Sequence, residues 1–400
     1  MHDSSADGSP IDFRPDPSPR RAVRRAVPNG SSRALALIGI LGCALFAGCS
    51  NSSSTSSDGA AAPSTAPGSQ TTAPAPSGAG NSRGKTVGVA LASMNHNFFI
   101  GMRQGVEEGL AAEGLKGEIV VADDSATSQQ QQVEQLIQKG VGAIIMVPVD
   151  AEQAANPVRA ANQAKVPVFC IDRRVTAQGA SVTCTIETDN VAMGELAARH
   201  GLSLLCKRHG LDASKPDDVK KLKAKVVHLW GMEAASSAQD RARGFEKVFG
   251  AATTPGVTVL KQVGDFNARK SQEVLAPLLQ ANPDVELVYC HNDDNAMGAL
   301  NAVLDLKKSR ERADDPKRIL IVGIDGNRAA IEAIRKGDIE ATVSQEPIEM
   351  GRTTVAQVKR VLDGGAPEKD YVAVRHHLVT RTEADQLKGK LWADLLKGGR

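Results

Sequence analysis

The sequence predicts an α/β fold made of two lobes, each built around a parallel β-sheet. Two patterns predict the parallel sheets. Segments with helical apolar spacing alternate with strand-like runs, and those runs are continuously apolar, as in sheets covered on both faces. The alternating strands and helices form two successive series, which indicates two lobes. This fits a 400-residue chain, because such a chain exceeds the usual size of one hydrophobic core.

The first series begins with an apolar run at 85–93 and a helical segment at 100–114. Further strand-like runs follow at 117–125, 141–150 and 166–174, with helical segments at 128–140 and 151–165 between them.

The second series begins with a helix at 191–208. Its strands are expected at 223–231, 257–264, 285–293 and 318–325, and its helices at 238–251, 269–282, from Asn295 onward, and 328–337.

The N-terminal segment is predicted to direct export. The run "ALALIGILGCALFA", residues 34–47, carries no charge and follows the arginine-rich "RRAVRR". It is shorter than the roughly 20 apolar residues of a spanning helix but suits a signal peptide, which we place at 1–48 with a long N-region. The export route and the true start codon stay open.

Small residues precede Cys49 in "LFAGC", which resembles the lipobox of bacterial lipoproteins and implies lipidation of Cys49. Cleavage before Cys43 would leave a very short apolar region. Residues 49–84 are almost entirely Ser, Thr, Ala, Pro and Gly, so we expect a lipid-anchored, disordered linker.

The charge of the body argues against a nucleic-acid partner. The whole chain has a formal net charge of +2, and much of that surplus lies in the first 33 residues. The folded part is therefore near neutral and lacks the basic surplus on which phosphate binding depends.

Polar and aromatic residues follow the predicted strands. Since ligands of such sheets bind beyond the carboxyl ends of the strands, these residues are candidates for one site. They are Asn95, His96, Phe98 and Phe99, then Asp172 and Arg173, and in the second series Gln239, Arg241, Phe266, Asn292, Asp325 and Gln345.

A set of motifs gives a specific resemblance. "NHNFF", "VPVFCIDRR", "ETDN", "DRARGF", "DFNARKS", "NPDVELVYCHNDDNAMGAL", "VGIDGN" and "ATVSQEP" occur in order between about Lys85 and Val374. Together they resemble periplasmic sugar-binding proteins of the ribose and galactose type, the type I substrate-binding proteins of ABC importers.

The resemblance implies two Rossmann-like lobes joined by a three-crossover hinge. It places the crossovers near Thr188, just past Gln345, and after Val374. The N-terminal lobe is then 85–188 plus 346–374, and the C-terminal lobe is 189–345 plus 375–400.

The resemblance also implies how the site residues act on a monosaccharide or polyol. Phe98, Phe99 and Phe266 would cover the apolar C–H faces of the ring. Charged and amide side chains would bond adjacent hydroxyls, with Asp172 and Asp325 among them. We also expect one of the two adjacent phenylalanines to belong largely to the core edge.

Three positions depart from the ribose-type pattern. His96 stands where asparagine is usual, Asn97 stands where proline is expected, and the family's sugar-contacting arginine aligns with Gln239. Ribose is therefore one candidate among several pentoses, hexoses and polyols.

The implied function is that of an exported, monomeric binding protein rather than an enzyme, with an ABC permease as its partner. The H-E-x-x-H motif is absent from the sequence, and no metal or cofactor is expected. The alternative is a sensory protein that passes sugar occupancy to a chemoreceptor or membrane kinase. Pairing of Cys170, Cys184, Cys206 and Cys290 stays open.

Overall fold

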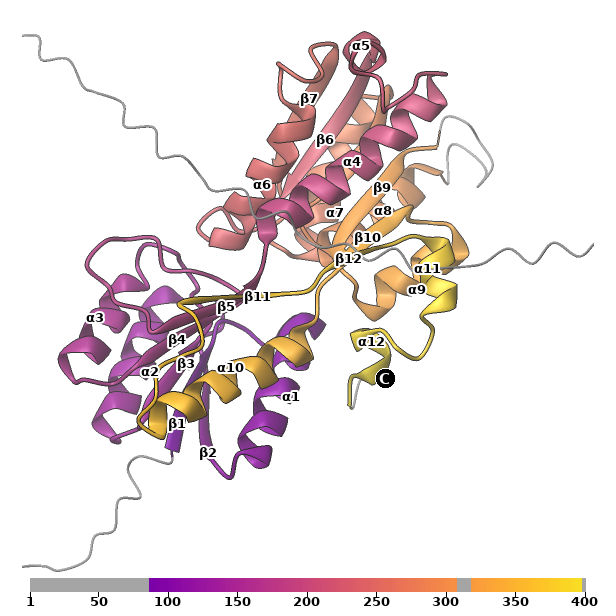
Figure 1. The fold of residues 1–400 in the computed structure, drawn as a ribbon. Helices are drawn as coiled ribbons and strands as arrows, with labels where there is room; N and C mark the ends of the chain where they lie inside the picture. The colour runs from indigo at the N-terminus through magenta and orange to yellow at the C-terminus, as the bar shows by residue number, and fades with distance from the viewer. Residues whose placement is uncertain (1–85, 308–317, 398–400) are drawn as a thin grey trace, which may run out of the picture. The chain divides into compact units, whose positions relative to one another are not determined.

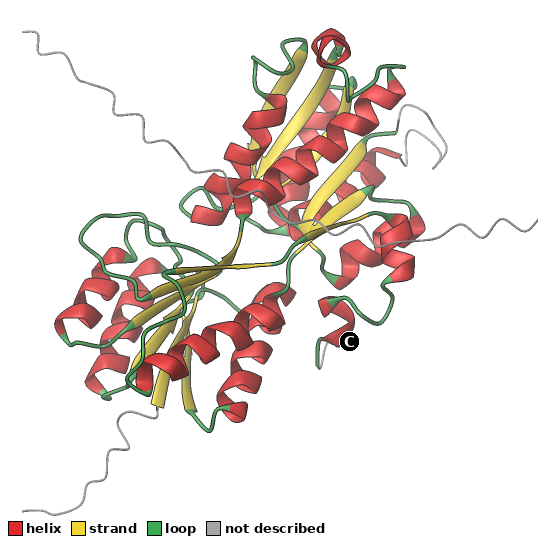
Figure 2. Cartoon of the chain, viewed as in Figure 1, coloured by secondary structure: helices red, strands yellow, loops and turns green. Residues whose placement is uncertain are grey.

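A computed structural model describes residues 86–307 and 318–397, which carry two six-stranded sheets (Figures 1 and 2). The predictions for Cys49, the signal peptide and the linker lie outside these residues. Among the described residues, no helix is both long enough and apolar enough to cross a membrane.

The first lobe is the sheet with strand order β2-β1-β3-β4-β5-β11, in which every neighbouring pair is parallel, together with its helices. Its elements are β1 (Thr86–Leu91), α1 (Asn97–Ala112), β2 (Lys116–Val121), α2 (Ala126–Gln138), β3 (Ala143–Met146), α3 (Ala155–Gln163), β4 (Val168–Ile171), β5 (Cys184–Thr188), α10 (Pro347–Leu362) and β11 (Tyr371–Val374).

The second lobe has strand order β7-β6-β8-β9-β10-β12, parallel except for the antiparallel β10–β12 pair. Its elements are α4 (Asn190–Arg208), α5 (Pro216–Lys221), β6 (Ala224–Trp230), α6 (Ser236–Phe249), β7 (Val257–Val263), α7 (Ala268–Ala281), β8 (Val285–Cys290), α8 (Asp293–Lys307), β9 (Leu320–Asp325), α9 (Arg328–Lys336), β10 (Ala341–Ser344), β12 (His377–Val379) and α11 (Arg381–Gln386).

The chain passes between the sheets three times. It leaves β5 for α4, leaves β10 for α10, and leaves β11 for β12. Helix α10 therefore lies beside α1 in the first lobe, although it follows the second-lobe strands in sequence (Figure 1).

The central strands are buried because their side chains are apolar on both faces. All four residues of β3, "AIIM", are buried, and the side chains of Ile144 and Ile145 belong to core clusters on opposite faces of the sheet. This is the pattern expected of a parallel sheet with helices on both sides.

Polar caps fix where several helices begin. Asp189 caps α4 by accepting from the backbone N–H of Ala192, and Asn267 caps α7 by accepting from that of Lys270. These helix starts matter because the loops that precede them begin at the carboxyl ends of strands β5 and β7.

Candidate functional site

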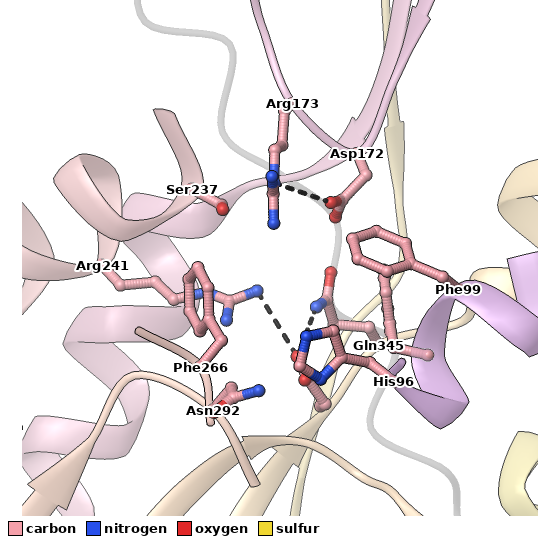
Figure 3. Close-up of a pocket in the computed structure, with 11 residues that line it drawn as sticks. His96, Phe99, Asp172, Arg173, Ser237, Arg241, Phe266, Asn292 and Gln345 are labelled. Atoms are coloured by element: carbon pink, nitrogen blue, oxygen red, sulfur yellow. Dashed lines mark hydrogen bonds and ion pairs between the residues drawn. The ribbon is translucent and has the colours of Figure 1, made fainter. Parts of the chain in front are cut away.

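The strand-end loops of both lobes surround one pocket (Figure 3). The pocket is lined by His96, Phe98, Phe99, Asp172, Arg173, Ser237, Arg241, Phe266, Asn292, Asp325 and Gln345.

Aromatic rings reach the pocket from both lobes. Phe98 and Phe99 lie in the first turn of α1, with their ring centroids 5.7 Å apart in an edge-to-face arrangement. Phe266 comes from the loop between β7 and α7. The Arg173 guanidinium lies 5.4 Å from the Phe99 centroid and 5.7 Å from the Phe266 centroid, so a cation stands between flat surfaces of the two lobes.

The first lobe contributes a buried ion pair from neighbouring residues. Arg173 Nε lies 3.6 Å from Asp172 Oδ2, which is longer than a hydrogen bond. Burial raises the pKa of Asp172, although Arg173 and Arg241 oppose that shift. Within the described residues, Arg173 Nε makes no hydrogen bond, so the pocket holds a buried donor that can still form one.

The second lobe contributes a pair assembled from distant segments. Arg241 Nη2 lies 3.5 Å from Asp325 Oδ1, while Arg241 Nε donates to Asn190 Oδ1 at 2.9 Å and Nη1 donates to the His291 carbonyl oxygen at 2.6 Å. Burial raises the pKa of Asp325 to about 6, against the lowering effects of Arg241 and Gln345.

Close packing of two helices sets the position of Arg241. A Cβ at residue 194 would lie 2.4 Å from the Arg241 carbonyl oxygen, so Gly194 allows α4 to approach α6 at this point. The Tyr289 hydroxyl adds long hydrogen bonds to both Gly194 O and Arg241 O, at 3.3 and 3.4 Å.

Three pocket residues have backbone conformations that favour glycine. The φ angles are 67° at Asp172, 57° at Phe266 and 130° at Asp325. Such conformations cost on the order of 1–3 kcal/mol each and persist where the surrounding structure enforces them, often at ligand sites.

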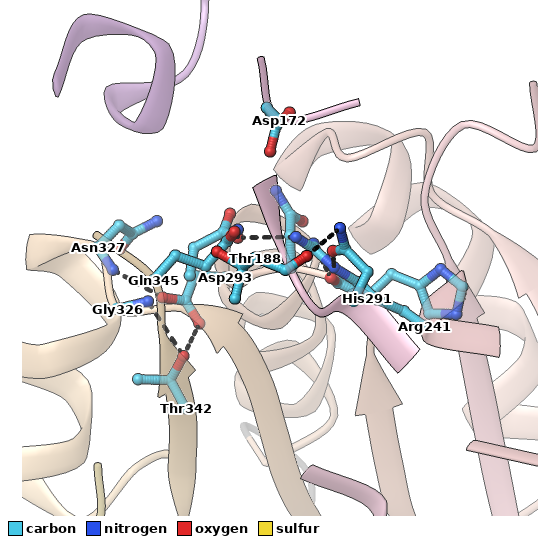
Figure 4. A network of polar contacts seen from close by, with 12 residues as sticks. Asp172, Thr188, Arg241, His291, Asp293, Gly326, Asn327, Thr342 and Gln345 are labelled. Atoms are coloured by element: carbon cyan, nitrogen blue, oxygen red, sulfur yellow. Dashed lines mark hydrogen bonds and ion pairs between the residues drawn. The ribbon is translucent and has the colours of Figure 1, made fainter. Parts of the chain in front are cut away.

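Buried hydrogen bonds hold Asp325 and the turn that follows it (Figure 4). Gln345 Nε2 donates to Asp325 Oδ1 at 2.7 Å. Asp293 accepts from the Thr342 hydroxyl and from the Asn327 backbone N–H, both at 2.7 Å, which ties β10 to the turn after Asp325. Burial and the charge of Asp325 raise the pKa of Asp293. Among the described residues, buried Gln345 Oε1 has no partner and offers an acceptor.

Direct contacts join the lobes at the edges of the pocket. His96 Nδ1 lies 2.9 Å from Asp294 Oδ2, with the two side chains 14% and 30% exposed. Elsewhere Arg174 pairs with Asp240, and the Ala151 N–H donates to the Ala234 carbonyl oxygen at 2.9 Å. The described structure therefore has the two lobes in contact around the pocket.

The comparisons with known proteins now identify the family. The sequence pattern of the periplasmic binding protein domain matches residues 87–366. The chain is also 33% identical over 298 residues to the ribose import binding protein of Bacillus subtilis, covering 74% of this chain and 88% of that relative. The chain belongs to the periplasmic binding protein family.

Two further binding proteins are similar to most of this chain. The D-apiose import binding protein of Paraburkholderia graminis is 28% identical over 305 residues, covering 75% of this chain and 89% of that protein. A solved ABC transporter solute binding protein from Mycobacterium smegmatis, with bound glycerol, is 26% identical with a TM-score of 0.64, covering 76% and 97% of the two chains. These matches confirm the predicted family, the two-lobed α/β fold, and a binding protein rather than an enzyme.

This periplasmic binding protein brings ten of the twelve sequence-predicted binding residues to the pocket, all but Asn95 and Gln239. Asn95 is exposed in the loop before α1. Gln239 does not line the pocket either, because it lies on the far side of α6, where its Nε2 donates to the Glu233 carbonyl oxygen at 3.0 Å. Those two placements differ from the prediction.

Ser237 lines the pocket and was missed by reasoning from the sequence. It precedes Arg241 by four residues on α6, so the two share one face of the helix. That spacing is the signal that would have found it.

The core role expected of one phenylalanine is shared by both. The Phe98 ring packs edge-to-face on Trp392 with centroids 6.3 Å apart, and Phe99 faces the Arg173 guanidinium. Both rings also belong to the first-lobe core.

The four cysteines of the described body, Cys170, Cys184, Cys206 and Cys290, are free and buried. Cys170 and Cys184 lie on adjacent strands but belong to core clusters on opposite faces of the sheet, which separates their side chains. Among the described residues, no group of three or more His, Cys, Asp or Glu side chains could hold a metal ion.

Proposed function

We propose that this periplasmic binding protein is the lipid-anchored substrate-binding component of an ABC sugar importer. It binds one monosaccharide or polyol in the pocket between its lobes. The relatives support this proposal by name, since they include import binding proteins for ribose and for D-apiose.

One observation carries the proposal. The pocket holds a buried unpaired donor, Arg173 Nε, and a buried unpaired acceptor, Gln345 Oε1, beside aromatic surfaces from both lobes. Buried polar groups normally have partners, so both point to a ligand that donates and accepts hydrogen bonds. A sugar hydroxyl does both, and its ring offers C–H faces to Phe99 and Phe266.

The remaining pocket residues fit the same ligand. The carboxylates of Asp172 and Asp325 accept from hydroxyls, while Arg241 and Asn292 donate to them. Because contacts come from both lobes, the ligand favours the arrangement with the lobes together over one with them apart. We place the hinge after Thr188, after Gln345 and after Val374, and the anchor at Cys49.

A thermal-shift screen tests the binding role. Protein beginning at Ser50 is mixed with pentoses, hexoses, polyols and nucleosides. A ligand at a hundredfold excess over its Kd stabilises the native state by about 2.7 kcal/mol. We expect a shift with a sugar or polyol, its loss in Asp325→Asn, and its retention in Gln239→Ala. A panel without any shift, or a shift unaffected by Asp325→Asn, would contradict the proposal.

Fractionation of a bacterial host that expresses the full chain tests the anchor. Wild-type protein should sediment with membranes, and Cys49→Ser should be released into the soluble extracytoplasmic fraction. Cys43→Ser is the matched control and should stay with membranes. Equal sedimentation of all three proteins would rule out Cys49 as the anchor.

A further inference from the structure

A short segment near the end of the described chain contacts both lobes. After α11 the chain forms the four-residue helix α12 (Trp392–Leu395), and we call residues 391–397 the C-terminal strap. Trp392 is only 1% exposed and is among the largest fully buried side chains. The strap lies beyond residues 87–366, which match the family pattern.

On the second-lobe side, the strap is bonded to the binding site itself. Trp392 Nε1 donates to the Asp325 carbonyl oxygen at 2.9 Å. The Arg328 guanidinium donates to the Ala393 carbonyl oxygen at 3.3 and 3.0 Å. Since the Asp325 backbone has the unfavourable φ of 130°, a buried donor to its carbonyl helps to hold that conformation.

On the first-lobe side, the Trp392 ring packs on the start of α1 and on α10. It meets the Phe98 ring edge-to-face, and Ile348 joins it in a small apolar cluster. A Cβ at position 101 would come within 3.3 Å of the indole, so Gly101 makes room for the ring. The indole therefore touches one pocket residue from each lobe.

Polar contacts continue this attachment along α1. Gln104 Nε2 donates to the Leu395 carbonyl oxygen at 3.3 Å, and Gln104 Oε1 accepts from the Lys397 backbone N–H at 2.8 Å. The Lys397 ammonium also pairs with Glu108 at 2.5 Å.

We propose that the C-terminal strap positions the binding site and favours the arrangement in which the lobes share the pocket. Trp392 is its positioning residue. It fixes the Asp325 backbone and the Phe98 ring without touching the ligand. This inference rests on the proposed binding function, and its physical basis is that apparent affinity scales with the fraction of protein in the binding-competent conformation.

Two pairs of variants test the strap in protein beginning at Ser50. Trp392→Phe removes the indole N–H but keeps an aromatic ring. Its control is Trp230→Phe, which also removes one indole N–H bond, to His228 Nδ1 at 3.2 Å. Gln104→Ala breaks the strap's polar tie, and Gln130→Ala is its control. Each glutamine bonds a glutamate four residues on, Glu108 or Glu134.

The first measurement is hydrogen exchange without any ligand. The Gln345 N–H donates to the Asp325 carbonyl oxygen at 3.1 Å, and the Gly326 N–H donates to Thr342 Oγ1 at 3.2 Å. We expect peptides covering 323–327 and 341–346 to exchange about fivefold faster or more in Trp392→Phe and Gln104→Ala. Both controls, and peptides from α7 in every variant, should match wild type.

The second measurement is calorimetric titration with D-ribose. We expect affinity to fall about five- to tenfold in Trp392→Phe and Gln104→Ala, the effect of losing about one buried hydrogen bond, and to stay unchanged in the controls. Unchanged hydrogen exchange at 323–327 would contradict the proposed role of the C-terminal strap. Faster exchange with unchanged D-ribose affinity would contradict it as well. If wild-type protein does not bind D-ribose, the exchange measurement alone decides the strap, and the failure falls on the proposed ligand.

Discussion

The two arginine–aspartate pairs of the pocket differ in how firmly the protein holds the arginine. Arg241, in the second lobe, donates to Asn190 and to the His291 carbonyl oxygen and stands against Asp325. Arg173, in the first lobe, stands against Asp172 and makes one long hydrogen bond, from Nη1 to the Pro148 carbonyl oxygen at 3.3 Å. The second-lobe guanidinium is therefore preorganised, whereas the first-lobe guanidinium keeps a buried donor for the ligand.

The largest expected effect is that of Arg241→Ala on stability as well as binding. Removing this guanidinium leaves the buried Asp325 carboxylate without its cation and the His291 carbonyl oxygen without its donor. Breaking a buried pair in this way costs about 3–5 kcal/mol. Chemical denaturation should show that loss, and ligand binding should disappear. Near-wild-type stability would show that Arg241 is not the structural member of the two arginines.

Arg173→Ala should separate binding from folding. It breaks the 3.6 Å pair with Asp172 and one long hydrogen bond, fewer contacts than Arg241 makes, so it should destabilise the fold less than Arg241→Ala does. Affinity should fall about 100-fold, because hydrogen bonds to charged groups contribute roughly 1.5–3 kcal/mol each. Calorimetry and denaturation on the same samples measure both effects. A larger stability loss here than in Arg241→Ala would reverse the comparison.

A smaller expected effect is a pH dependence of ligand affinity, caused by the His96–Asp294 contact between the lobes. Burial lowers the pKa of His96, but the hydrogen bond and charge of Asp294 outweigh it, with Asp124 adding and Arg173 opposing. The net pKa is raised above its ordinary value. Because this carboxylate faces His96 only when the lobes are together, the contribution to closure is present below about pH 6.5 and is lost as pH rises through the raised pKa.

Titrations at pH 5.5 and pH 8 should therefore show wild-type affinity gaining relative to Asp294→Asn at the lower pH. A partly exposed pair contributes up to about 1 kcal/mol, so the relative gain should not exceed about fivefold. His96→Gln is the matched variant and should behave like Asp294→Asn. Parallel pH profiles for wild type and both variants would remove this pair from the closure equilibrium.

Much of the site was predictable because strand ends are predictable. Asp172, Asn292 and Asp325 each end or follow an apolar run that could only be a buried strand, and parallel sheets bring such ends to one edge. The motif resemblance predicted that the two lobes share one site, which hydrophobic periodicity alone does not indicate. The strand ends and the motifs together predicted pocket residues in both lobes.

Two features were beyond this reasoning for physical reasons. Residues 391–397 form a short strap whose four-residue helix is too brief to show periodicity, so its contacts with Asp325 and α1 depend on tertiary packing alone. The partners of Arg241 depend on the close approach of α4 and α6 at Gly194, which no local pattern reveals.

The smallest expected effect tests the placement of side chains around α6. Successive helical residues turn by about 100°, so Ser237 and Arg241 face the pocket while Gln239 points away. Ser237→Ala should weaken binding about threefold, through loss of a neutral hydrogen bond. Gln239→Ala should change affinity less than twofold, since its bond to the Glu233 carbonyl oxygen is exposed. A larger loss of affinity in Gln239→Ala than in Ser237→Ala would contradict this placement and support the ligand contact that the family resemblance implies for Gln239. It would mean that α6 turns a different face to the pocket when ligand is bound.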